Sequence, residues 1–412
     1  MSTAKKKQCL ICNDSSLIKY LDLGETSLAN SYLKKSELKK PEIIFPLKVY
    51  YCQNCHLAQL TDLVDRKILF ENYAYFSSTS PQLHMHFKKY AAEVFSRFPR
   101  QAKRFTLEIA SNDGILLKYF YKLGAKVLGV DPAKNIAKIA KKNGIKTLPV
   151  FFDDKVSEYI LKRYGPAGII TANNVLAHTD NPHGIIKGVK KLLDTDGVFV
   201  FEVQYLADLL KKNEFDNTYH EHTCYFSLAP LKKLLEMWGL QIFDVQHVDT
   251  QGGSLRIYAG HTPLLFPLNN SVKQLSSQEK RQGLYTVKRY KKFGSAPIKI
   301  KKDLVGLLNN LKKSNKKIVG YGAAAKATTL TEYCGIGQQF IDYIVDDSPQ
   351  KQGKYMPGTH IPIFSAQKLK ENMPDYVLLF AWNYTDSIIK RESWLKENGV
   401  KFIKPIPDVK II

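Results

Sequence analysis

The sequence predicts an α/β protein with three parts: a small cysteine-rich N-terminal module, a central Rossmann-like domain and a second, C-terminal Rossmann-like domain. Four of the six cysteines stand in two CxxC pairs near the N-terminus, and two later stretches alternate short apolar runs with helical segments. At 412 residues the chain is too long for one ordinary core, because a domain takes about 100–200 residues. The expected domains are 1–70, 71–275 and 276–412, with a basic, helix-prone segment at 274–316.

The N-terminal module contains Cys9-x-x-Cys12 and Cys52-x-x-Cys55. One CxxC supplies two thiolates from a single turn, so two such turns complete the tetrahedron that a structural zinc ion prefers. Because protein would fill all four positions, no position remains for water, and we expect a structural rather than a catalytic ion. The alternatives are unliganded cysteines in turns, or a site in which His56 replaces one of the four ligands.

The chain is strongly basic, with 61 Lys and Arg against 38 Asp and Glu and a net charge of +23. Such a charge suits nucleic acid, an anionic membrane surface or small phosphorylated ligands. The basic residues are scattered in twos and threes without a nucleic-acid reader motif, which favours a solvated surface over a nucleic-acid partner. No window has the ~18 apolar residues of a membrane span, so we expect no membrane association and a cytoplasmic location, and a monomer is slightly favoured.

The central domain begins where short apolar runs start to alternate with helical segments. The expected strands are 105–109, 126–130, 168–170 and 198–201, and helices are expected between them. Strands separated by helices at this spacing require right-handed crossovers and form a parallel, doubly wound sheet. A second alternation of this kind follows, with strands expected at 317–320, 340–345 and 376–380.

The first turn of the central domain is the expected cofactor site. Segment 107–114 follows a strand and precedes a helix, which is the corner where α/β sheets bind nucleotides. Asp131 ends the next strand, about 20 residues later, where an acid can accept hydrogen bonds from both hydroxyls of a ribose. The turn has one glycine and lacks GxGxxG, which favours S-adenosylmethionine, a cofactor without pyrophosphate, over a dinucleotide. The predicted cofactor-binding residues are Glu108, Ala110, Asn112, Gly114, Asp131, Pro132, Asn173 and Asn174.

A cluster of titratable residues, Tyr219-His220-Glu221-His222, lies between two expected elements. Loops with such clusters are often catalytic, and we expect acid–base chemistry here. The alternatives are a metal ion bound by the two histidines and the glutamate, or a structural hydrogen-bond network. In an extended segment the side chains at i and i+2 point away from that at i+1, so three neighbours would not converge easily on one ion.

In these motifs the chain resembles, over nearly its whole length, the sugar C-methyltransferases that act on nucleotide-linked 4-keto-deoxysugars. The shared blocks are, in chain order, the two CxxC pairs, Tyr73-x-Tyr75-x-Ser77-Ser78, Glu108-Ile109-Ala110-Ser111-Asn112-Asp113-Gly114, Tyr219-His220-Glu221-His222, Gly252-Gly253-Ser254-Leu255-Arg256 and Gly320-Tyr321-Gly322-Ala323-Ala324-Ala325-Lys326. Each block is weak alone, but six in the same order are specific. One departure is Ala110, which stands where many methyltransferase loops have glycine.

The resemblance implies a zinc-binding domain, a methyl-donor domain and a C-terminal domain that helps to bind the sugar nucleotide, with a dTDP-linked sugar as the expected substrate. It implies that His222 is the general base and that Tyr75, His178, Tyr219 and Glu221 lie near the sugar. The chemistry agrees, because a ketone acidifies the neighbouring C–H bond and a neutral histidine can take that proton near neutral pH. The alternatives are an O- or N-methyltransferase on a sugar nucleotide, and a zinc-containing nucleic-acid-binding protein.

The C-terminal domain has a second strand–turn–helix corner at 320–326. Helix N-terminal amides there favour a phosphate, and Lys326 could add charge. We interpret this corner as a binding site for the nucleotide diphosphate, and the alternative is a Rossmann-like unit with only a packing role. The predicted substrate-binding residues are Ser254, Arg256, Tyr321, Lys326 and Asn383.

Overall fold

The computed structural model describes residues 4–71, 76–250 and 252–412, and the chain divides into two compact units. The first unit comprises Met1–Ile18, Tyr51–Ala207 and Thr223–Val287, and the second comprises Lys19–Tyr50, Asp208–His222 and Lys288–Ile412. The chain therefore passes between the units several times. None of the helices in the described part of the chain has the length and apolar character needed to cross a membrane.

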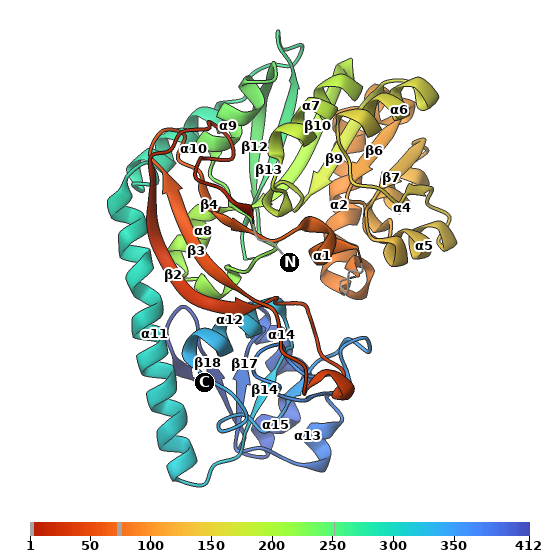
Figure 1. The fold of residues 1–412 in the computed structure, drawn as a ribbon. Coiled ribbons are helices and arrows are strands. Elements are labelled where there is room, and N and C mark those ends of the chain that lie inside the picture. Colours follow the sequence, from red (N-terminus) through yellow and green to blue (C-terminus); the bar gives the residue numbers. More distant parts are fainter. Residues whose placement is uncertain (1–3, 72–75, 251) are drawn as a thin grey trace. The chain divides into compact units, whose positions relative to one another are not determined.

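The first unit contains a seven-stranded sheet with the order β12-β13-β10-β9-β6-β7-β8 (Figure 1). Its parallel strands are β6 (Thr106–Ile109), β7 (Val127–Val130), β8 (Thr147–Leu148), β9 (Ala167–Asn173) and β10 (Leu193–Gln204). The two remaining strands, β13 (Ser254–His261) and β12 (Leu240–Val248), are antiparallel and extend one edge. The predicted α/β class is confirmed, and the antiparallel edge is a feature that the sequence did not predict.

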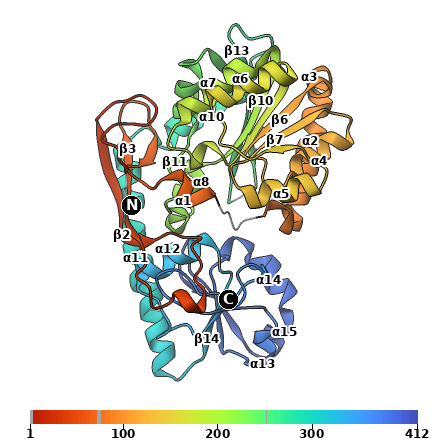
Figure 2. The ribbon, with the colours of Figure 1, turned by 45° about the vertical axis from the view of Figure 1, so that its right-hand side comes forward.

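Helices cover both faces of this sheet (Figure 2). One face has α2 (Pro81–Arg97) packed against α4 (Ile115–Lys122), and the other has α6 (Asp154–Tyr164) packed against α7 (Pro182–Leu192). The aromatic core includes Tyr90, Phe120 and Tyr258, which are completely buried, and burial of such a side chain contributes about 1.5–3 kcal/mol.

Shorter elements complete the first unit. They are β1 (Ala4–Lys5), β4 (Ala58–Leu60), β5 (Asp62–Leu63), α1 (Arg66–Phe70), η2 (Ser77–Thr79), α3 (Pro99–Arg104), α5 (Lys134–Lys142), η3 (Leu176–His178), β11 (Cys224–Tyr225), α9 (Leu228–Glu236) and α10 (Asn270–Arg281). A further helix, α8 (Leu206–Lys211), begins in this unit and ends in the second. Strand β4, which follows the second CxxC pair, is antiparallel to β11, the strand just after the titratable cluster.

The second unit contains a six-stranded sheet with the order β16-β15-β14-β17-β18-β19. Its strands are β14 (Ile318–Tyr321), β15 (Ile344–Val345), β16 (Ile363–Phe364), β17 (Tyr376–Leu379), β18 (Lys401–Lys404) and the antiparallel β19 (Lys410–Ile411). The strand expected at 340–345 is shorter and covers only Ile344–Val345. Because β15 lies on one side of β14 and β17 on the other, the strand order reverses at β14, which is where such sheets bind ligands.

The other elements belong wholly or mostly to the second unit. They are β2 (Leu17–Ser27), η1 (Lys35–Glu37), β3 (Ile44–Cys52), η4 (Phe215–Asn217), α11 (Val287–Lys313), α12 (Ala325–Cys334), α13 (Lys368–Glu371), η5 (Trp382–Tyr384), α14 (Thr385–Arg391) and α15 (Ser393–Glu397). Helix α11 approaches β2 closely at Gly294, where a Cβ would lie 1.8 Å from the carbonyl oxygen of Tyr20. Only glycine permits that approach.

Candidate active site

The four predicted metal ligands come together. The sulfur atoms of Cys9, Cys12, Cys52 and Cys55 all lie within 4.8 Å of one another, with Cys9 and Cys55 sulfurs 3.4 Å apart and Cys12 and Cys52 sulfurs 3.5 Å apart. A tetrahedron with zinc–sulfur bonds of about 2.3 Å has sulfur–sulfur edges of about 3.8 Å, so the four thiols fit a zinc ion. Hydrogen bonds with Cys52 and Cys9, together with burial, raise the pKa of Cys55. A divalent cation at this site would favour the thiolate form of the four cysteines, because its charge offsets theirs.

The turn of the first CxxC pair is linked to the seven-stranded sheet through His183 on α7. Its Nε2 donates to the carbonyl of Ile11, a residue between the first two cysteines, at 2.8 Å. The indole of Trp238 donates to Nδ1 of the same imidazole at 2.9 Å, which fixes the tautomer. His56 instead contacts Tyr51, whose hydroxyl oxygen lies 2.6 Å from its Nδ1. The four cysteines therefore complete the predicted zinc site without His56.

The cofactor corner between β6 and α4 has an unusual backbone. Ala110, Asn112 and Gly114 all have positive φ values, of 52°, 49° and 80°. A positive φ strains alanine, which explains why methyltransferase loops often have glycine at the position of Ala110. Amides of the segment before α2 contact this turn: Ser77 N donates to Asn112 Oδ1 at 2.9 Å and Ser78 N to Asp113 Oδ2 at 3.0 Å.

Asp131 lies beside this turn, at the carboxyl end of β7. Its two carboxylate oxygens accept hydrogen bonds from the amides of Asn112, at 2.8 Å, and Ala133, at 2.9 Å. Each oxygen keeps a second lone pair, so two ribose hydroxyls can still bind. Burial raises the pKa of Asp131 to about 6, against the opposing effect of the two amides. Pro132 separates Asp131 from Ala133 and is half-buried.

Three side chains at the corner have a buried oxygen without a hydrogen-bond partner among the described residues. They are Oε2 of Glu108, Oδ1 of Asp113 and Oδ1 of Asn173. The other end of Asn173 donates to Glu108 Oε1 at 3.4 Å. Burial raises the pKa of Glu108 well above its usual range. Such oxygens need donors, which the ammonium and ribose hydroxyls of S-adenosylmethionine supply, so the corner fits this cofactor. Asn174 follows with a φ of 55°.

The titratable cluster forms a turn rather than an extended segment, because His222 N donates to the carbonyl of Tyr219 at 2.9 Å. The turn brings the rings of Tyr219 and His222 together, with centroids 4.0 Å apart. It directs Glu221 elsewhere, since this carboxylate accepts a 2.6 Å hydrogen bond from the amide of Asn30. His220 is buried beside Phe45. The premise of an extended segment was therefore wrong, but His220, Glu221 and His222 still form no metal-binding group among the described residues.

The tautomer of His222 follows from its two partners. The carbonyl of Asn217 can only accept, so Nδ1, 2.7 Å away, carries the hydrogen. Nε2 then has the lone pair and accepts from the Tyr219 hydroxyl at 2.8 Å. Burial lowers the pKa of His222 to about 4, and the positive charge of Lys326 adds to this effect against the hydrogen bond to Asn217. The imidazole is thus neutral at neutral pH, as a general base must be.

Three residues that the sequence did not predict, Glu214, Asp216 and Thr329, form hydrogen bonds around this turn. Glu214 accepts a 2.5 Å hydrogen bond from the Asn217 amide, and Asp216 accepts one of 2.7 Å from the Trp382 indole. Thr329 on α12 donates to the carbonyl of Thr218 at 2.8 Å. A possible signal was the acidic spacing Glu214-x-Asp216 just before the cluster, but nothing in the sequence indicates that both acids are buried.

Three predicted residues lie in the first unit, apart in sequence from the cluster. His178 is half-buried, with its ring 5.9 Å from that of Phe70. Ser254 is buried and donates to the carbonyl of Thr250. Arg256 is buried in a network: it donates to Glu202 and Glu93 at 2.8 and 2.9 Å and lies over the ring of Tyr90. Tyr75 lies outside the described residues.

The remaining predicted residues lie at the carboxyl ends of β14 and β17 in the second unit. The hydroxyl of Tyr321 donates to Glu392 at 2.9 Å and accepts from Arg391. Lys326 donates to Asn383 Oδ1 at 3.1 Å, and its ammonium lies 4.4 Å from the ring centre of Trp382. Gly322 has a φ of 94°, and a Cβ there would lie 2.6 Å from that of Ala381, so the two turns are in close contact.

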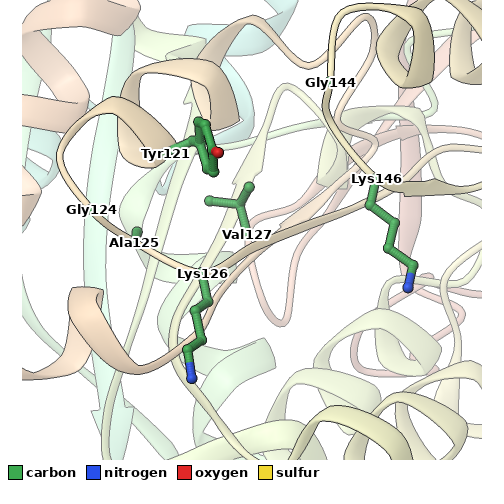
Figure 3. Close-up of a pocket in the computed structure, with 7 residues that line it drawn as sticks. All are labelled: Tyr121, Gly124, Ala125, Lys126, Val127, Gly144 and Lys146. Atoms are coloured by element: carbon green, nitrogen blue, oxygen red, sulfur yellow. The ribbon is translucent and has the colours of Figure 1, made fainter.

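An open hollow on the first unit is not part of this site. Tyr121, Lys126, Val127 and Lys146 are among the residues that line it (Figure 3). It lies at the amino end of β7, whereas Asp131 follows the carboxyl end of the same strand. Parallel sheets bind their ligands at the carboxyl ends, and none of the predicted site residues lines the hollow.

Three family models match the chain. Residues 9–70 match a model described as "Putative zinc binding domain", residues 83–245 match "Methyltransferase domain" and residues 249–407 match "C-methyltransferase C-terminal domain". C-methyltransferase NovU of Streptomyces niveus is 35% identical over 405 residues, which cover 98% of this chain and 96% of that protein.

Two more distant matches concern only parts of the chain. A ubiquinone biosynthesis O-methyltransferase of Glaesserella parasuis is 32% identical over 98 residues, which cover 22% of this chain and 42% of that protein. The solved structure of the CcbJ methyltransferase from Streptomyces caelestis is 14% identical, covers 48% of this chain and 99% of that one, and has a TM-score of 0.37. The predictions of S-adenosylmethionine as methyl donor and of a structural zinc ion are confirmed by the family models and the four-cysteine cluster.

Proposed function

Since this chain belongs to the S-adenosylmethionine-dependent C-methyltransferases, we propose that its substrate is a nucleotide-linked, dTDP-type 4-keto-deoxysugar and that the methyl group is added to a carbon next to the ketone. The observation that supports this best is the neutral His222. Its Nε2 lone pair accepts a hydrogen bond from the Tyr219 hydroxyl, which can donate to a substrate oxygen instead. A base of this kind suits a carbon acid. Methylation of a hydroxyl oxygen does not depend on acidifying a C–H bond.

The proposed reaction begins with proton removal. His222 Nε2 takes the proton from the carbon next to the ketone, and the electron pair moves to the ketone oxygen to form an enolate. For this, the Tyr219 hydroxyl must leave Nε2, and it can then donate to the enolate oxygen. The carbonyl of Asn217 stabilises the imidazolium that forms, because it already accepts from Nδ1. Glu221, oriented by Asn30, and the predicted Tyr75 and His178 position the sugar.

The methyl donor binds at the corner between β6 and α4. Bound S-adenosylmethionine supplies an electrophilic methyl group on its sulfonium. Asp131 would hold the ribose hydroxyls through the second lone pair of each oxygen, and Glu108 and Asn173 would accept from the ammonium. The turn at Ala110, Asn112 and Gly114 allows the backbone to lie close to the donor, and Pro132 and Asn174 flank it.

The substrate's nucleotide is proposed to bind at the second corner, at the amino end of α12. Helix amides there attract phosphate, and the net charge of +23 favours an anionic substrate. Tyr321, Lys326 and Asn383 lie at this corner, and Ser254 and Arg256 complete the proposed set of substrate-binding residues. The buried contacts of Arg256 with Glu202 and Glu93 favour an indirect role for this residue.

The test measures hydrogen exchange and methyl transfer separately. With a 4-keto sugar nucleotide in deuterated water and no methyl donor, the enzyme should exchange a hydrogen next to the ketone. His222→Ala and His222→Asn should lose this exchange by at least about a hundredfold, while the exposed His247→Ala is a matched control that should retain it. Full exchange in both His222 variants would refute the base assignment, and methyl transfer to oxygen without exchange would refute C-methylation of this substrate.

A further inference from the structure

Two acids lie buried under the turn that contains His222. Glu214 is 1% exposed and Asp216 is completely buried. One oxygen of each has a hydrogen bond, Glu214 from Asn217 and Asp216 from Trp382. The other oxygens, Oε1 of Glu214 and Oδ1 of Asp216, have no hydrogen-bond partner among the described residues. Neither acid belongs to the predicted site.

Such a pair requires a compensating charge, because an isolated buried carboxylate is strongly destabilising. Burial raises the pKa of Glu214 to about 7 and also raises that of Asp216, and the charge of Asp216 adds to the shift at Glu214. The positive charge of Lys326 opposes the shift at both acids, and Lys212 opposes it at Glu214. Lys326 is thus the cation that acts on both carboxyls.

The position of Lys326 agrees with this role. Its ammonium lies over the ring of Trp382, 4.4 Å from the centroid, and the indole N–H of the same ring donates to Asp216. Asn383 fixes the ammonium through a 3.1 Å hydrogen bond. Lys326 and Asp216 are therefore joined through one aromatic side chain.

We propose that Lys326 is a positioning residue, whose charge balances Glu214 and Asp216 and thereby holds the turn that orients His222. The connection is short: Glu214 binds the side chain of Asn217, and the carbonyl of Asn217 binds Nδ1 of His222. This role is additional to any contact of Lys326 with substrate phosphate. The inference about the base rests on the proposed function, but the inference about charge balance does not.

The first experiment needs no substrate. Lys326→Met should lower the Tm of the full chain by more than about 4 °C. Adding Asp216→Asn or Glu214→Gln should recover at least half of that loss, because it removes the uncompensated charge. Lys326→Arg should keep the Tm within about 2 °C, and the exposed Lys390→Met should show no coupling to Asp216→Asn. If the Tm losses of the single variants simply add, the charge balance is refuted. If Lys326→Met does not fold, Lys326→Gln takes its place as the neutral variant. A Tm of Lys326→Arg as low as that of Lys326→Gln would then refute the charge balance.

The second experiment measures the exchange of sugar hydrogen with deuterated water in the same variants. Lys326→Met should lower the exchange rate at saturating substrate by about tenfold or more with little change in KM. It should also move the acid limb of the pH profile upward, because the cation near His222 is gone while Asn217 and Tyr219 remain. Lys326→Arg should restore both. A raised KM with unchanged rate and pH profile would make Lys326 a phosphate ligand only and would overturn the positioning role.

Discussion

Replacement of Asp131 by alanine should weaken the binding of S-adenosylmethionine strongly. The carboxylate already accepts two backbone amides, from Asn112 and Ala133, and has one free lone pair on each oxygen for a ribose hydroxyl. A hydrogen bond to a charged acceptor contributes about 1.5–3 kcal/mol. Two of them amount to about 3–6 kcal/mol, which corresponds to a Kd about 10²- to 10⁴-fold higher.

The same carboxyl should make the affinity depend on pH. Burial raises the pKa of Asp131 to about 6 in the ligand-free protein. The ligand binds the ionised form, so the affinity should be constant well above pH 6 and should fall by up to tenfold per pH unit below it. Burial also raises the pKa of Glu108, so Glu108→Gln is needed to assign the titrating group.

Isothermal titration with S-adenosylmethionine between pH 5 and 8 measures both effects. Asp131→Asn, which cannot ionise, should bind weakly and without this pH dependence, and the fully exposed Asp249→Asn should behave as the parent protein. A Kd for Asp131→Ala within about threefold of the parent value would refute the ribose assignment. An affinity of the parent protein that does not change between pH 5 and 7.5 would refute the role of the carboxylate.

Two further predictions concern the zinc ion and the base. Cys52→Ser should lose the bound zinc and lower the Tm by more than about 5 °C, as measured by metal analysis and thermal unfolding. The control variant Cys334→Ser should retain the metal. Full zinc occupancy in Cys52→Ser would contradict the four-cysteine site. Tyr219→Phe should lower the rate of sugar hydrogen exchange about tenfold or more, because the enolate oxygen loses its proposed hydrogen-bond donor, with the exposed Tyr121→Phe as control. An unchanged exchange rate would remove Tyr219 from the reaction.

The parts of the site that sequence reasoning predicted are those encoded by neighbouring residues. The spacing of the four cysteines indicates a tetrahedral site, and the structure brings their sulfurs together. The pattern of strand, small residues and helix places Gly114 and Asp131 at one corner, and a direct hydrogen bond joins Asp131 to that turn. Each CxxC pair and the turn at 110–114 is a local pattern that a short stretch of sequence contains, although the sulfurs that meet across the zinc site are 40 and 46 residues apart.

The sequence by itself determined the α/β class, the zinc ligands and the composition of the cluster at 219–222. Only the tertiary structure decided how that cluster works. The turn, the tautomer of His222 and the contact of Glu221 with Asn30, 191 residues away, depend on which segments meet. The burial of Glu214 and Asp216 beside Lys326 depends on the same packing. Residue identity fixes what a side chain can donate, accept or ionise, but its partners and its solvation, which set its pKa, come from distant parts of the chain.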